Sequence, residues 1–71
     1  MSRYLIVIET TSTGFSAYSP DLPGCAATGG TREEVERNMQ EAIEFHIEGL
    51  RQAGEAVPQP RSQAGYCEVA A

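Results

Sequence analysis

The chain has 71 residues, which is room for one domain. Ten acidic residues face five arginines, no lysine is present, and the formal net charge is −5. Proteins that bind nucleic acid normally present a basic patch, so direct binding to DNA or RNA is not expected. A basic protein partner would be attracted electrostatically, although the same charge also simply keeps a protein soluble.

The chain shows few of the features that usually stabilise a small domain. Domains of this size commonly add a disulfide, a metal or a partner subunit. Cys25, Cys67 and the single histidine, His46, do not have the spacing of a zinc site. A Cys25–Cys67 disulfide is possible, but the apolar surroundings favour buried, reduced cysteines. We therefore expect no cofactor or metal, and expect a partner protein or oligomerisation to supplement stability.

The N-terminal segment begins a strand predicted over residues 3–9. Its apolar run covers five residues, Tyr4–Ile8, which is too short for a signal peptide or a membrane helix. We therefore expect a cytoplasmic protein. Both faces of this strand are apolar, which is typical of a central strand covered on both sides. The helix would cover one face, and a second subunit is a candidate for the other.

Two further strands are predicted before the helix. Residues 15–19 alternate between apolar and polar side chains, and a polar loop of four or five residues joins them to the first strand as a hairpin. The Pro20–Gly24 segment is a rigid corner, because each proline fixes φ and lacks a backbone donor. A short strand follows over residues 25–28.

The helix, predicted over residues 32–53, has the clearest local signals. Thr31 and Glu34 fit a capping box, in which Thr31 is the N-cap and Glu34 reaches back to its amide. Gly54 is placed to end the helix. Apolar residues and His46 recur at helical spacing on one stripe, while glutamates and arginines lie opposite. The stripe comprises Val35, Met39, Ala42, Ile43, His46, Leu50 and Ala53.

A last strand is predicted over residues 66–70. The element order is therefore β-β-β-α-β in a single domain that spans residues 1–71. The fold class is α+β, with an antiparallel sheet and one long helix packed on one face.

The sequence resembles the N-terminal domain of HicB-type antitoxins. The resemblance is carried by GFSAYSPDLPGC (residues 14–25), then Gly30-Thr31, Glu33-Glu34, and GEAVPQP (residues 54–60). Val35 replaces the usual alanine. The similarity covers the chain from about Tyr4 to Val69. It implies a partial RNase H-like fold in which the last strand lies beside the first.

The resemblance also implies a function. Antitoxins of this family bind a small toxin that cleaves messenger RNA, of the HicA type, and mask its active site. Such toxins tend to be basic, in agreement with the acidic balance of this chain. Full-length members often carry a C-terminal DNA-binding module, which these 71 residues do not include. The alternative is a solitary HicB-like domain that forms a homodimer or higher oligomer without a toxin.

An RNase H-like fold raises the further alternative of a metal-dependent nuclease. Two-metal nucleases gather carboxylates around Mg²⁺. Candidates are Glu9, a helix glutamate and Glu68. However, Glu9 lies at the end of its strand, and the helix glutamates lie opposite the apolar stripe. We therefore expect a protein that is not an enzyme and has no catalytic residues.

Candidate partner-binding residues lie in the proline corner and on the helix. Asp21 could contact a partner or cap its own turn, and Leu22, if exposed beside Pro23, could anchor one. His46 could be a buried histidine bonded to backbone or to a tyrosine, a catalytic group, or a pH-sensitive interface residue. Phe45 and Ile47 flank the apolar stripe, so they either widen the buried face or contact a second subunit.

Overall fold

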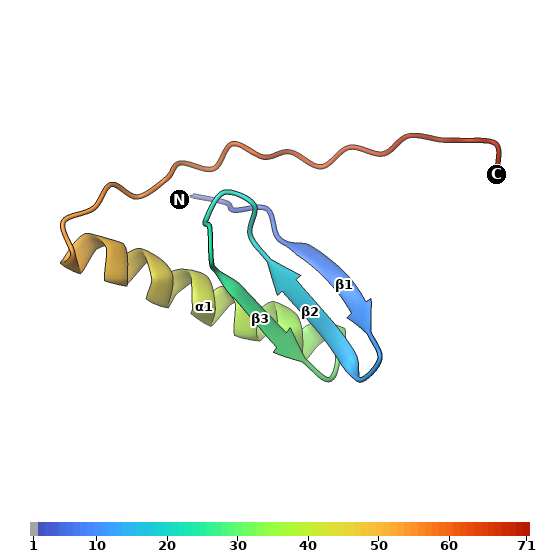
Figure 1. Cartoon of the computed structure of the whole chain (residues 1–71), viewed down its shortest axis with the longest axis horizontal. Coiled ribbons are helices and arrows are strands. Elements are labelled where there is room, and N and C mark those ends of the chain that lie inside the picture. Colours follow the sequence, from blue (N-terminus) through green and yellow to red (C-terminus); the bar gives the residue numbers. More distant parts are fainter. Residues whose placement is uncertain (1) are drawn as a thin grey trace.

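The computed structural model describes residues 2–71, in which one helix packs on one face of a three-stranded antiparallel sheet. The strands are β1 (Val7–Thr11), β2 (Gly14–Tyr18) and β3 (Ala26–Gly29), and they pair in that order. The helix α1 (Arg32–Gln52) crosses β2 and β3 (Figure 1). This arrangement confirms the predicted α+β class.

The β1–β2 hairpin is tighter than predicted. Thr11 pairs with Gly14, so only Ser12 and Thr13 form the loop. A side chain at position 14 would collide with the backbone carbonyl of Gly29, because the end of β3 lies close to the start of β2. Glycine at this position therefore permits the close approach of the two segments.

Strand β1 begins later than predicted, at Val7 instead of residue 3. Its register with β2 pairs Val7 with Tyr18, and continuing that register would set Leu5 opposite Pro20. Proline has no backbone N–H and cannot extend the ladder. The Leu5 carbonyl instead accepts a hydrogen bond from the Ser19 hydroxyl at 3.0 Å, which ties residues before β1 to the corner after β2.

The core lies between the sheet and α1. Ala17 on the inner face of β2 is buried, and so are Val35 and Met39 on α1. Alternation along the strands and helical spacing along α1 direct these side chains into one layer. Half-buried apolar side chains surround them, namely Tyr4, Ile6, Ile8, Phe15, Ala27, Ala42, Ile43 and Ile47.

The caps of α1 follow the prediction closely. The Thr31 hydroxyl accepts from the Glu34 amide at 3.1 Å, as an N-cap does, and Gly54 adopts a left-handed φ of 72° just after the helix. The Glu34 carboxylate accepts from the Gly30 amide at 2.6 Å instead of the Thr31 amide expected for a capping box. Within residues 2–71, no helix has an apolar stretch long enough to cross a membrane.

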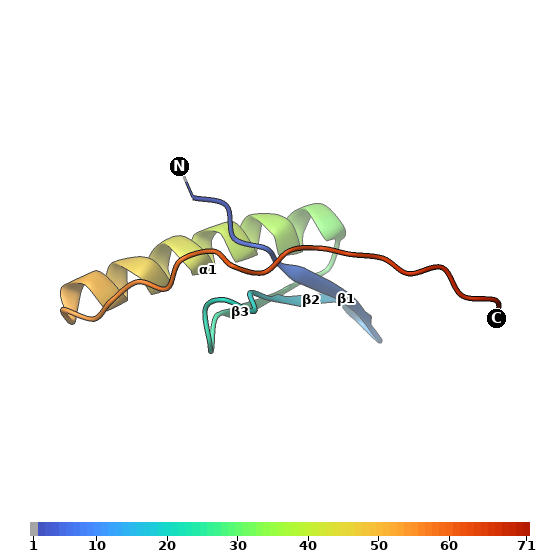
Figure 2. The ribbon, with the colours of Figure 1, turned by 90° about the horizontal axis from the view of Figure 1, so that it is seen from above.

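The predicted fourth strand over residues 66–70 does not form, and this part of the expected topology is corrected. After α1 the chain turns at Ala53 and Gly54 and then runs on without strand pairing; we call residues 53–71 the tail. Figures 1 and 2 both show its C-terminal end leaving the sheet. The tail contributes to the elongated shape of the molecule, which measures 47 × 27 × 20 Å along its principal axes.

Candidate protein-binding surface

The proline corner between β2 and β3 folds back on itself. The Ser19 amide donates to the Cys25 carbonyl at 3.2 Å, and the Leu22 and Cys25 amides donate to the Ser19 and Leu22 carbonyls at 3.1 and 3.0 Å. These bonds turn Leu22 inward, where its side chain is 0% exposed. Leu22 was expected to anchor a partner only if its side chain was exposed. Because the side chain is buried, Leu22 is a core residue. Pro23 is exposed.

Asp21, in the same corner, holds the tail. Its Oδ2 accepts from the backbone amides of Arg61 and Ser62, both at 2.9 Å, and its Oδ1 accepts from the Ser62 hydroxyl at 2.9 Å. The hydrogen bond from the Ser62 amide lowers the pKa of Asp21 most, followed by that from the Arg61 amide, because both stabilise the ionised carboxylate. We call this set of contacts the Asp21 latch.

The tail has a second attachment nearer the helix. The Tyr4 hydroxyl donates to the Pro58 carbonyl at 2.6 Å. Both attachments lie in the first half of the tail, and beyond Ser62 the chain is exposed through Ala71. Tyr66 is 97% exposed and Val69 is 78% exposed. The latch thus fixes where the tail passes the sheet, while its last residues remain uncovered.

A second exposed apolar group lies on the outer face of α1. Phe45 is 83% exposed, so it does not widen the buried face of the helix. Glu41 lies one turn before it and Glu48 about one turn after it, on the same side of the helix. With Glu44, these residues form what we call the Phe45 patch, an aromatic side chain surrounded by exposed carboxylates.

The two neighbours of Phe45 differ from it. Ile47 is half-buried and packs against the core, as the default interpretation expected. His46 is also half-buried and does not belong to the fully buried core. The structure therefore brings Phe45 to the surface, and turns His46 and Ile47 toward the body of the protein.

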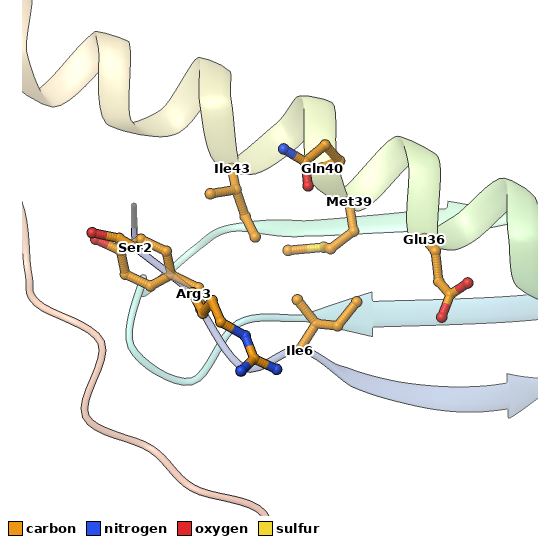
Figure 3. Close-up of a pocket in the computed structure, with 8 residues that line it drawn as sticks. Ser2, Arg3, Ile6, Glu36, Met39, Gln40 and Ile43 are labelled. Carbon is orange, nitrogen blue, oxygen red and sulfur yellow. The ribbon is translucent and has the colours of Figure 1, made fainter.

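A groove lies between the N-terminal segment and α1 (Figure 3). It has a volume of about 270 Å³ and an apolar floor that includes Ile6, Met39 and Ile43. Arg3 and Glu36 stand on its two sides. Binding sites for small molecules are usually larger and enclose several converging polar groups. This groove is better described as a surface seam between two segments.

The acidic residues considered for a nuclease site lie on different parts of the molecule. Glu9 is exposed at the sheet and Glu68 lies on the uncovered part of the tail. Within residues 2–71, no group of three or more histidine, cysteine or acidic side chains could hold a metal ion. Cys25 is buried, and burial raises the pKa of its thiol, whereas Cys67 is exposed. Both cysteines are free, so the disulfide considered above is not formed.

The tail contacts were not found by sequence reasoning. Asp21 was expected either to cap its own turn or to meet a partner, yet its acceptor atoms bind Arg61 and Ser62, about 40 residues along the chain. Local patterns identify turns and caps, but an extended polar segment such as residues 61–65 carries no periodic signal. The Tyr4–Pro58 bond was missed for the same reason.

Comparison with known proteins agrees with this fold. Residues 4–69 match the model of a family described as the HicB-like antitoxin of bacterial toxin-antitoxin systems. A chain of a HicA3 and HicB3 toxin-antitoxin complex is 38% identical and superimposes with a TM-score of 0.74, covering 84% of this chain and 70% of that chain.

Curated relatives span very different lengths. A 14.9 kDa protein from the rep-hol intergenic region of Haemophilus phage HP1 is 44% identical over 55 residues, which are 78% of this chain and 41% of the phage protein. A UPF0150 protein of Thermoplasma acidophilum is 32% identical over 62 residues, which are 86% of this chain and 90% of that protein. The family match covers both the proline corner and the tail, and the chain therefore belongs to the HicB-like antitoxin family of bacterial toxin-antitoxin systems.

Proposed function

We propose that this chain is an antitoxin that binds a small mRNA-cleaving toxin of the HicA type and masks the toxin's active site in the cytoplasm. The observation that carries the proposal is the 38% identity, over 84% of this chain, to a chain of a toxin-antitoxin complex. In this proposal the protein acts by stoichiometric binding, and it catalyses no reaction itself.

The charge of the helix supports a basic partner. Helix α1 carries six glutamates against three arginines, and its exposed surface supplies much of the net charge of −5. A basic toxin, as the family resemblance implies, would be steered toward this surface. Charge alone gives fast association, and tight binding also needs an apolar anchor.

The Phe45 patch supplies such an anchor. Aromatic side chains dominate the energetics of many interfaces when surrounding groups exclude water from them. Phe45 is exposed in this chain, and Glu41, Glu44 and Glu48 stand around it as acceptors for arginine and lysine. We therefore place the toxin contact on the outer face of α1, with Pro23 as a secondary candidate at the proline corner.

The test is to co-express this chain with the small protein encoded by the neighbouring gene. Growth should be restored, the two proteins should co-purify, and added antitoxin should stop RNA cleavage by the toxin at about a one-to-one ratio. The variant Phe45→Ala and the double variant Glu41→Gln/Glu48→Gln should weaken inhibition. The matched control Glu33→Gln/Glu55→Gln removes two carboxylates outside the patch and should inhibit normally.

Two results would argue against the proposal. Failure of any small basic neighbour to bind would favour the solitary, self-associating alternative. RNA cleavage by this chain alone with Mg²⁺ or Mn²⁺, lost in Glu68→Ala, would instead indicate a nuclease. Normal inhibition by the Phe45 variant would leave the antitoxin function in place and would move the contact away from α1.

A further inference from the structure

The sheet ends in an open edge at β1. Within residues 2–71, β2 is the only strand that pairs with β1, and the other side of β1 faces no strand. An uncovered edge presents a row of unpaired N–H and C=O groups, which is a template for another strand. The start of this edge and the segment before it are apolar on both sides, with Ile6 and Ile8 packed against the core and Leu5 and Val7 alternating with them, whereas Glu9, Thr10 and Thr11 at the far end of β1 are exposed.

The end of the tail has the properties of the missing strand. Residues 66–70 are YCEVA, which contain the strand-favouring Tyr66 and Val69 and neither proline nor glycine. In an extended chain, Tyr66 would lie on one face and Val69 on the other, which matches the two apolar faces of the β1 edge. Both side chains are almost fully exposed, so neither has found a place to be buried in its own chain.

The Asp21 latch fixes the tail beside this edge without closing it. Residues 63–66 and 5–8 line opposite sides of one open hollow of about 450 Å³, and no backbone hydrogen bond crosses it. Nine residues follow Ser62, enough to reach about 30 Å when extended. Beyond the hollow, both views show the tail leaving the body of its own chain (Figures 1 and 2).

We propose that the end of the tail, residues 66–70, adds as a fourth strand to the β1 edge of a second copy of this chain. Each copy would then supply one strand and one edge, so the exchange is reciprocal and closes as a two-fold dimer. The latch sets the direction in which the strand leaves, and Gln63, Ala64 and Gly65 form the hinge. The exchange buries Tyr66 and Val69 and pairs the open backbone groups of β1.

This proposal does not depend on toxin binding, and its test uses the full chain alone. Light scattering and sedimentation should show a dimer for the unmodified chain. The double variant Tyr66→Asp/Val69→Asp should be monomeric at concentrations where the unmodified chain is dimeric. These side chains are exposed in the monomer, so the variant should keep the helical signal of the fold. The matched control Ala56→Asp/Gln59→Asp adds two carboxylates before the latch and should remain dimeric.

The exposed Cys67 allows the pairing itself to be checked. A chain carrying Cys67→Ser with a cysteine at Leu5, Val7 or Glu9 is mixed with the unmodified chain under mild oxidation. A disulfide joining Cys67 to at least one edge position of the other chain is expected, since the added strand lies along that edge. Across the three positions, absence of any such link would overturn the proposal.

Three further outcomes would also overturn it. A single chain that carries Val7→Cys and retains Cys67 could form the disulfide within a monomer, which would show that the fourth strand closes on its own sheet. A monomer whose tail stays exposed to solvent would show that the β1 edge remains unpaired. A tail whose residues become buried only when the toxin is added would show that the toxin, and not a second copy of this chain, covers the β1 edge. The first two of these results do not bear on whether the Phe45 patch binds a toxin.

Discussion

Leu22 and Tyr66 are both large apolar residues in segments without regular secondary structure, yet Leu22 is fully buried and Tyr66 is 97% exposed. The difference reflects the two regions in which they lie. The body, residues 4–52, surrounds its apolar residues with a sheet, a helix and a folded corner. The tail, residues 53–71, attaches to that body by side-chain hydrogen bonds and buries almost nothing beyond Ser62.

The comparison shows that a segment of this protein can be held in a fixed position without its apolar side chains being buried. Packing stabilises the body, since removing apolar surface from water contributes about 25 cal/mol per Å². Hydrogen bonds position the tail, and each contributes little net stability because water competes for the same groups. A tail positioned in this way remains free to bury its apolar end in another molecule. The following predictions test that division.

The largest effect is expected for Leu22→Ala. Its side chain is fully enclosed, so truncation should lower the free energy of unfolding by about 2–5 kcal/mol, measured by urea denaturation. The comparison is Phe45→Ala, which removes a larger side chain that is 83% exposed and should change stability by no more than about 0.5 kcal/mol. Equal losses for the two variants would mean that the corner is not part of the core.

The contact between β3 and α1 is tested by Gly29→Ala. A Cβ at this position would lie 2.6 Å from the Val35 amide nitrogen, and neither backbone segment can move away easily. We expect a loss of about 1–3 kcal/mol in thermal or chemical unfolding. In Gly49→Ala, by contrast, the new methyl group meets nothing within 4 Å. That helical variant should be more stable by about 0.5–1 kcal/mol, so a loss there would contradict the helix assignment.

The first attachment of the tail is tested by Tyr4→Phe. This change removes the hydroxyl that donates to the Pro58 carbonyl and leaves the ring packed against the core. Stability should fall by about 0.5–1.5 kcal/mol in the same urea measurement. Tyr66→Phe removes a hydroxyl from an exposed ring and serves as the control, with no change expected for the monomer.

The Asp21 latch should affect the tail and leave the body nearly unchanged. In Asp21→Ala, the Arg61 and Ser62 amides lose their acceptor. Trypsin should then cleave after Arg61 several-fold faster, because a segment that opens locally becomes accessible to proteases. The urea midpoint should move less than in Leu22→Ala. Glu55→Ala, an exposed carboxylate in the same tail, should leave the cleavage rate unchanged, and equal acceleration there would argue against the latch.

The smallest effect is the pH dependence of the same latch. Its hydrogen bonds hold the pKa of Asp21 below the ordinary value of 3.8. A lowered pKa means that the stabilisation is fully present above pH 3.8 and is lost as pH falls through the lowered value. The amide proton shifts of Arg61 and Ser62 in NMR spectra should therefore stay constant from neutral pH to about pH 4 and change below it. A transition near neutral pH would assign the latch to another group.

Much of the body could be predicted from local pattern. The alternation in residues 15–19, the Thr31 cap and Gly54 located β2 and both ends of α1 to within one or two residues. These signals act over one turn or one strand, so neighbouring residues suffice to interpret them. The start of β1 was placed too early because its limit is set by Pro20, which follows the partner strand β2.

The candidate site was only partly predictable. Sequence reasoning selected Asp21 and Phe45, and the structure gives each a distinct environment, one in the latch and one in an exposed acidic patch. It could not assign Leu22 to the core, because burial depends on how the corner folds back over the sheet. Sequence reasoning could not identify Ser62 as a hydrogen-bond partner of Asp21, because no feature of either segment indicates that the two lie side by side in the fold.

The sequence by itself determined the α+β class, the helix with its caps, the proline corner and the acidic surface, because these follow from the spacing and chemistry of adjacent residues. Only the tertiary structure decided which apolar residues are covered and where the tail runs. Those features depend on contacts between segments tens of residues apart, whose formation is governed by the shape of the assembled body. The strand expected over residues 66–70 is the clearest case, since within residues 2–71 this segment pairs with no strand even though the outer edge of β1 is open.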